Sequence, residues 1–216
     1  ISSLQTFGPA YSSADDPSIR FRDFYRDFFK TGVNQTLNVS LSGGTEKINY
    51  FLSASSSKDE GIIANTDYTR KTLKFNGGYK LSENLKLGTS VSYAKSGGAR
   101  ANGGDKSIMS SLSYWSPSID VNDYITPNGS EKDWSGGNID QPLYFAKMSN
   151  LTDKVDRWIA SADLTWQTKP WLNIVYRASV DNYAETRNRF VPKDLDPGSP
   201  VKGFIVNENT NFTGLN

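Results

Sequence analysis

The sequence contains neither cysteine nor histidine, and it has no long run of apolar residues. The absence of cysteine excludes a disulfide framework and thiolate chemistry. The absence of histidine removes a usual member of zinc sites and of Ser-His-Asp catalysis. A transmembrane helix needs roughly 20 apolar residues, so a helical membrane protein is excluded. A membrane β-barrel stays open, because its strands are only half apolar.

An excess of charge of either sign is also missing. The 24 lysine and arginine residues nearly balance the 23 aspartate and glutamate residues, and they are scattered along the chain. Without a basic patch in the sequence, nucleic acid is not an expected partner. Aromatic residues make up 12% of the chain, which argues against disorder. Abundant glycine, serine, threonine and asparagine favour strands and turns over helices.

Residues 1–33 are predicted to be irregular apart from one short amphipathic helix. Its aromatic residues fall near helical spacing, and Gly32 would close it. They are Phe21, Phe24, Tyr25, Phe28 and Phe29. Packing is the ordinary interpretation of this helix, and docking to a partner is the alternative.

Residues 34–183 alternate between apolar and polar side chains in six runs, which we interpret as three hairpins. Short turns at residues 43–47, 82–84 and 169–170 join the strands of each hairpin. A long outer loop is predicted at about residues 95–155. Residues 184–216 are predicted to hold another outer loop and the start of a further strand. The chain begins without methionine and ends in mid-pattern, so we expect both ends to be cuts in a longer polypeptide.

Three features favour an antiparallel transmembrane β-barrel over a soluble β-sandwich. The alternating runs are about nine to eleven residues long, as a tilted strand needs to cross a bilayer. Short turns alternate with long loops, as in outer-membrane barrels. Aromatic residues lie near the strand ends, where interfacial girdles are found: Tyr79, Tyr93, Trp158, Trp166 and Trp171. Six strands cannot close a barrel, so the fold class is an all-β barrel segment with long outer loops and a short N-terminal helix.

Specific motifs then point to a family. They are FFKTG at 28–32, NVSLSGGTEK at 38–47, GIIANTD at 61–67, SIDVNDY at 118–124 and DRW at 156–158. Together they resemble the barrel of SusC/RagA-type TonB-dependent transporters of Bacteroidota, over about residues 21–183. The resemblance implies an outer-membrane location and active import of oligosaccharides or peptides. It further implies a SusD-like lipoprotein lid and coupling to TonB through a plug domain that has no counterpart in these residues.

The candidate site residues follow from this resemblance and from the chemistry of the loop. Aromatic side chains of the outer loop are candidates for contact with substrate or lid: Tyr114, Trp115, Tyr124, Trp134 and Tyr144. Packing of the loop against itself is the alternative for each of them. The charged residues expected to face the lumen are Asp163, Arg177 and Asp181, which could contact plug or substrate or pair with each other.

No catalytic residue, metal ligand or cofactor is predicted. The loop aspartates do not match the spacing of a calcium-binding EF-hand loop, and we interpret them as a solvated acidic loop: Asp120, Asp123, Asp133 and Asp140. Three alternative functions stay open at this point. They are a soluble or surface-anchored glycan-binding β-sandwich, a secreted glycoside hydrolase that uses Asp120 and Asp133, and a barrel that serves only as receptor or export channel.

Overall fold

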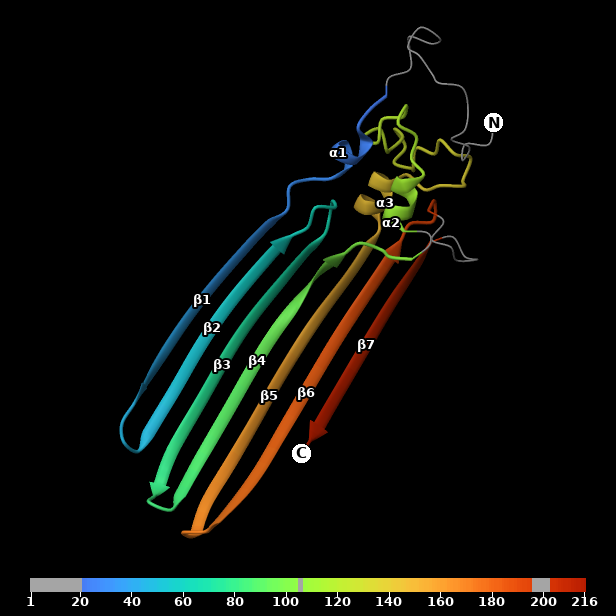
Figure 1. Ribbon diagram of the computed structural model, residues 1–216. Coiled ribbons are helices and arrows are strands. Elements are labelled where there is room, and N and C mark those ends of the chain that lie inside the picture. The colour runs from blue at the N-terminus through green and yellow to red at the C-terminus, as the bar shows by residue number, and fades with distance from the viewer. Residues whose placement is uncertain (1–20, 105–106, 196–202) are drawn as a thin grey trace.

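A computed structural model describes residues 21–104, 107–195 and 203–216 of the chain. Its main feature is one antiparallel sheet of seven strands in sequence order (Figure 1). The strands are β1 (Val33–Gly44), β2 (Ile48–Glu60), β3 (Asp67–Ser82), β4 (Leu85–Arg100), β5 (Asn150–Lys169), β6 (Leu172–Val191) and β7 (Phe204–Leu215). The predicted all-β, antiparallel architecture is confirmed. A single sheet does not fit the β-sandwich alternative.

The two ends of the sheet differ in their connections. Residues 45–47, 83–84 and 170–171 make short turns at one end (Figure 1). The opposite end carries the connections 61–66, 101–149 and 192–203 and all three described helices. These helices are α1 (Phe24–Phe28), α2 (Ile108–Ser113) and α3 (Pro142–Met148). None of the helices in the described residues is long and apolar enough to cross a membrane.

The strands extend farther than the sequence pattern predicts. β3 and β4 have 16 residues each, and β5 and β6 have 20 each, instead of nine to eleven. The outer loop expected at about 95–155 therefore covers only residues 101–149. The loop expected in 184–216 likewise starts only after Val191. The extra length was missed because alternation fades there: both faces of the extensions carry polar side chains, so the pattern resembles a loop.

Register sorts the side chains of the sheet into two faces. Directly paired residues of neighbouring strands lie on the same face, and alternate residues of one strand share it. One row crosses all seven strands: Leu41, Leu52, Phe75, Val91, Ala160, Val180 and Leu215. We call the face that carries this row the apolar face. The opposite face, with serine, asparagine, threonine and charged residues, is the polar face.

The loops and helices beyond the long end of the sheet form a small unit with its own core, which we call the cap. Its buried side chains come from four separated segments and include Phe28, Leu112, Phe145 and Leu195. The predicted N-terminal helix is present as α1, where the Asp23 carboxylate accepts a hydrogen bond from the Arg26 N–H at 3.1 Å. Residues 1–20 of the segment predicted to be irregular lie outside the described residues.

Two of the family motifs, FFKTG and GIIANTD, meet in the cap. Phe28 of the FFKTG motif is buried in its core, against which Ile63 and Ala64 of the GIIANTD motif pack. The Lys30 N–H donates to the Ile62 carbonyl at 2.8 Å, which joins the two motifs through the backbone. Asn65 donates from its side chain to the Lys147 carbonyl of α3 at 2.9 Å. These motifs therefore hold the cap on the end of the sheet.

Candidate functional site

The apolar face carries an uninterrupted hydrophobic band. It runs from the row of Tyr93 and Trp158 to the row of Leu85 and Trp166, and in the described strands no charged residue lies on this face between them. Eight residues separate Trp158 from Trp166, or about 27 Å at about 3.4 Å per residue. A strand tilt of about 40° reduces this to a height of about 21 Å, close to the ~25 Å apolar band of outer-membrane barrels.

This band is exposed to the surroundings of the chain. Leu41 of β1 and Leu73 of β3 keep 59% and 50% of their surface accessible, and Trp171 at the short end keeps 81%. A contiguous exposed hydrophobic surface of this kind marks an interaction with lipid or protein. Because the band also has the height of a bilayer core and aromatic rows near both limits, its features are those of a lipid-facing surface.

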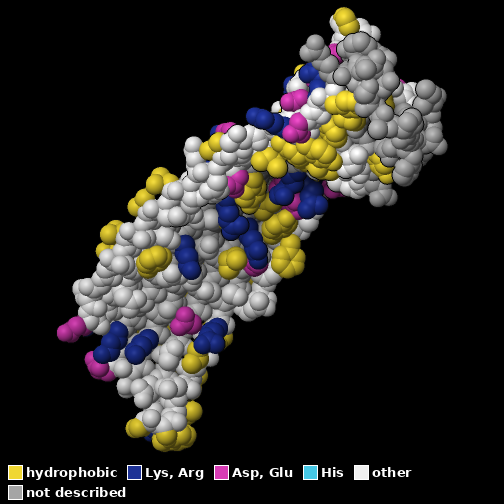
Figure 2. All heavy atoms as spheres, turned by 45° about the horizontal axis from the view of Figure 1, so that its top comes forward, with side chains coloured by type: hydrophobic (Ala, Val, Ile, Leu, Met, Phe, Trp, Pro, Cys, Tyr) yellow, Lys and Arg dark blue, Asp and Glu magenta, His cyan; other side chains and the backbone are white. Residues whose placement is uncertain are grey.

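The polar face has the composition of an aqueous passage. Figure 2 shows a face dominated by uncharged polar side chains and backbone, with Lys and Arg side chains scattered over its middle. Hydroxyl and amide groups bond across the strands there, as between Ser55 and Thr72 at 2.5 Å and between Ser90 and Asn76 at 2.9 Å. Such side chains offer hydrogen bonds to water, substrate or another protein domain without presenting a fixed charge of one sign.

All three charged residues predicted for the lumen lie on the polar face. Asp181 binds Arg157 through two parallel hydrogen bonds, Nε to Oδ1 at 2.9 Å and an NH2 group to Oδ2 at 2.5 Å. Asp163 and Arg177 are direct partners in the β5–β6 ladder, and both line an open depression of about 450 Å³. Structural pairing, the alternative considered for these charges, therefore holds for Asp181.

A glycine makes room for one of these charges. Gly88 of β4 pairs with Asp163, and a Cβ atom at Gly88 would lie only 2.3 Å from the Asp163 Oδ1 atom. The carboxylate therefore lies over the glycine backbone. Any larger residue at position 88 would displace it.

Sequence reasoning missed Arg157 as a member of this charged set. The sequence pattern does indicate that Arg157 lies on the polar face, because alternate residues of one strand share a face. Those residues are Arg157, Ile159, Ser161 and Asp163 of β5. A second missed group lies farther along β6, where Arg187 binds Glu185 at 2.6 Å.

Aromatic residues pack against one another inside the cap. The rings of Trp115 and Trp134 meet edge to face with centroids 5.3 Å apart. The Trp115 indole N–H donates to the Ile119 carbonyl at 3.1 Å. Lys147 of α3 donates to the Tyr124 hydroxyl at 3.1 Å, and its ammonium group lies 4.2 Å from that ring's centroid.

A hydrogen-bonded set links the cap to the end of β6. The Tyr144 hydroxyl donates to Asp194 at 2.6 Å, and the Glu131 N–H donates to the same carboxylate oxygen at 3.0 Å. Burial and the Asp194 carboxylate raise the pKa of Tyr144 above its ordinary value. Burial acts to raise the pKa of Asp194, but these two donors hold it below its ordinary value. Burial, opposed by a hydrogen bond from the Gln141 N–H, raises the pKa of Glu131 to about 7.

Comparisons with known proteins agree with this architecture. No protein-family model matches the chain. It is 22% identical to the TonB-dependent receptor P3 of Formosa agariphila over 219 residues, which covers 96% of this chain and 21% of the receptor. Two structures of the RagAB peptide importer, in a closed-closed and an open-open state, superpose with TM-scores of 0.66 at 20% identity. They cover 91% and 89% of this chain and 22% of the matched chain in each structure.

The fold is that of a segment of a RagA-type transporter barrel. The resemblance to SusC/RagA-type TonB-dependent transporters is confirmed, and the chain spans about a fifth of the length of the relatives that it matches. These relatives are receptors and importers, in agreement with the expectation that the chain is not an enzyme.

The aromatic residues predicted for contact lie mostly inside the cap. Trp115 and Tyr144 keep 4% and 3% of their surface exposed, so they belong to its core. Tyr124 and Trp134 are half-buried against that core, and only Tyr114 is open, with 61% exposed. In this conformation the predicted set is thus mainly a packing set, and Tyr114 alone offers a free ring.

The loop aspartates serve structural roles in the same cap. Asp120 forms an ion pair with Arg22 at 3.1 Å, and Asp123 binds Lys132. The Asp133 carboxylate accepts a hydrogen bond from the Ser135 N–H at 2.7 Å. Within the described ranges no cluster of acidic residues has the arrangement of a metal site.

Proposed function

We propose that this chain forms part of the barrel wall and outer mouth of an outer-membrane importer that takes up peptides or oligosaccharides and is energised through TonB. The observation that supports this proposal most directly is the hydrophobic band on the apolar face. The band holds no charged residue over about the height of a bilayer core, and the other face of the sheet is polar. The apolar face would contact lipid, and the polar face would line the lumen.

The position of the cap supports a role at the outer mouth. Outer-membrane barrels have short periplasmic turns and long extracellular loops, and the cap lies at the long-loop end (Figure 1). A SusD-like lipoprotein would cover this end, with Tyr114 as a free aromatic contact. The name of the RagAB importer favours peptides among the possible substrates.

Location and transport are tested together in the native organism. We expect the polypeptide that contains this segment to fractionate with the outer membrane, with an intact mass several times the 23.9 kDa of this chain. Deletion of its gene should abolish growth on one peptide or glycan source, and a copy that lacks the TonB-contacting segment should not restore it. A soluble polypeptide of about this chain's own mass, or normal growth of the deletion strain on every source, would contradict the proposal.

A further inference from the structure

A group of lysines lies on the apolar face directly beyond the hydrophobic band. Lys95 follows Tyr93 by two residues on β4, so the two side chains share this face about 7 Å apart along the strand. Lys71 is the direct cross-strand partner of Lys95. Lys58 and Lys154 belong to the next row, which runs Lys58, Thr69, Gly97, Lys154. Scattered in the sequence, these lysines are gathered by the register of four strands.

The arrangement places like charges against each other. Directly opposed side chains of the same charge destabilise a strand pair, so the Lys71–Lys95 pair needs compensation. Lys95 has a carboxylate partner only at 3.9 Å, in Asp156. In the described part of the chain, Lys71 and Lys154 have no carboxylate partner. The positive charge of this surface is therefore only partly neutralised by the chain.

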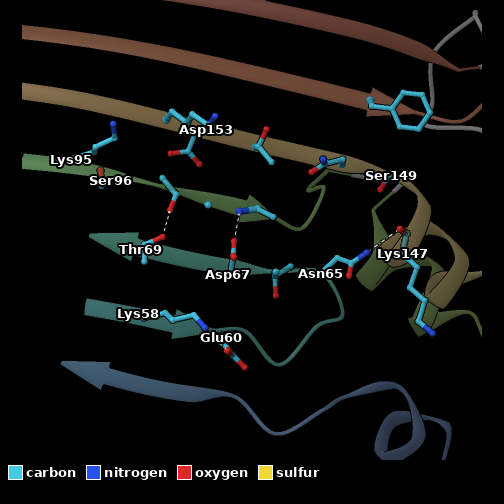
Figure 3. A pocket seen from close by; sticks show the side chains of 18 of the residues that line it. Lys58, Glu60, Asn65, Asp67, Thr69, Lys95, Ser96, Lys147, Ser149 and Asp153 are labelled. Carbon is cyan, nitrogen blue, oxygen red and sulfur yellow. Dashed lines mark hydrogen bonds and ion pairs between the residues drawn. The ribbon is translucent and has the colours of Figure 1, made fainter. Parts of the chain in front are cut away.

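A cavity of about 1000 Å³ opens at this place, between the extended strands and the cap (Figure 3). Six lysines line it, against three acidic residues. The lysines are Lys30, Lys58, Lys71, Lys95, Lys147 and Lys154, and all six are exposed.

The acidic residues of the cavity are already engaged. Glu60 binds Lys58 at 2.8 Å, and Asp67 accepts a hydrogen bond from the Ala99 N–H at 2.7 Å (Figure 3). Asp153 binds Arg100 through both carboxylate oxygens. The groups left to bind a ligand are mainly ammonium groups, which recognise phosphate as point charges.

We propose that this lysine cluster binds the phosphate groups of an anionic outer-leaflet glycolipid, whose acyl chains lie along the adjacent hydrophobic band. The inference rests on the proposed membrane location. In that location the row of Tyr93 and Trp158 marks the interface, and the lysines beyond it lie at the depth of lipid headgroups. A substrate in transit would follow the polar face instead, on the other side of the sheet.

The test uses the full-length transporter that contains this segment, purified in detergent, with bisphosphorylated lipid A as the probe and native mass spectrometry as the readout. We expect the double variant Lys71→Gln/Lys95→Gln to bind lipid A about 25-fold more weakly, since each lysine near an anionic surface contributes on the order of a fivefold effect. The matched control is Lys74→Gln/Lys86→Gln, which removes two lysines of the same strands from the polar face. It should bind as the unmodified protein does, and dephosphorylated lipid A should not distinguish the three proteins.

Several outcomes would overturn the inference. Equal lipid A affinity in all three proteins is one, and displacement of lipid A by inorganic phosphate, which would indicate a free-anion site, is another. A loss of affinity for the lid lipoprotein with unchanged lipid A binding would make the surface a protein interface instead.

Fractionation and uptake measured in the same strains separate this inference from the proposed function. Correct location and uptake without lysine-dependent lipid binding contradict only the lipid site. Absence from the outer membrane contradicts the proposed function itself.

Discussion

The sheet and the cap use hydrophobic side chains in opposite ways. In the cap, Leu112 and Phe145 are completely buried, and side chains from four distant segments surround them. In the sheet, Leu41 and Leu73 keep 59% and 50% of their surface exposed. The cap therefore buries its own apolar side chains as a small globular unit does, whereas the described residues leave the apolar face of the sheet uncovered.

The difference determines which substitutions each region tolerates. A cap residue contributes through close packing, so a change of volume matters. In the proposed membrane location a residue of the hydrophobic band would contact fluid lipid, so its polarity would matter more than its shape.

The largest effect is expected from truncation of a cap core residue. Phe145→Ala should destabilise the cap by about 3–5 kcal/mol, because it leaves a cavity in a fully enclosed site. Phe75→Ala on the apolar face should cost much less, since lipid can fill the space. Hydrogen exchange of cap amides in the detergent-solubilised full-length protein measures the stability of the cap in each variant. Equal protection of these amides in the two variants would contradict the expected difference between cap and sheet.

A charge at mid-depth is the complementary test on the sheet. Val91→Arg places a guanidinium in the row that crosses all seven strands and should cost about 2–4 kcal/mol in a bilayer. Ser90→Arg, one residue away on the polar face, should be tolerated. The yield of heat-modifiable, folded protein in the outer membrane is the readout. Equal yields from both variants would mean that the apolar face does not contact lipid.

The same distinction explains what could be predicted from sequence. A strand whose two faces have different surroundings alternates between apolar and polar side chains. The faces of Leu41, Leu52 and Asp163 could therefore be predicted from the sequence pattern. In the strand extensions both faces carry polar side chains, so the extension of β4 past Lys95 gave no such signal. The burial of Trp115 and Tyr144 depends on contacts with distant segments around Phe28 and Leu195, which local spacing does not reveal.

A smaller effect is expected where the cap joins the end of β6. Tyr144→Phe removes the hydroxyl that donates to Asp194 and should destabilise this junction by about 1–2 kcal/mol. Tyr114→Phe, at the exposed tyrosine of the same loop, should have no measurable effect on stability. Limited proteolysis within residues 192–203 reports opening of the junction. Equal cleavage rates in the two variants would show that the hydroxyl bond does not hold it.

The smallest effect is the pH dependence that Glu131 gives to the cap. Its folded pKa of about 7 lies above the ordinary value of 4.5, mainly because the half-buried carboxylate loses hydration. Between these two values the folded cap binds more protons than the unfolded segment, so its stability should fall as the pH rises from about 4.5 to about 7 and then level off. Since the group is only half-buried, we expect a change of about 1 kcal/mol rather than the full amount that the pKa difference implies.

Glu131→Gln keeps an oxygen to accept the hydrogen bond from the Gln141 N–H but removes the titration. Its cap protection, measured by hydrogen exchange corrected for intrinsic rates, should therefore be flat across this pH window and exceed that of the unmodified protein near pH 8. A slope that persists in Glu131→Gln would assign the pH dependence to another group.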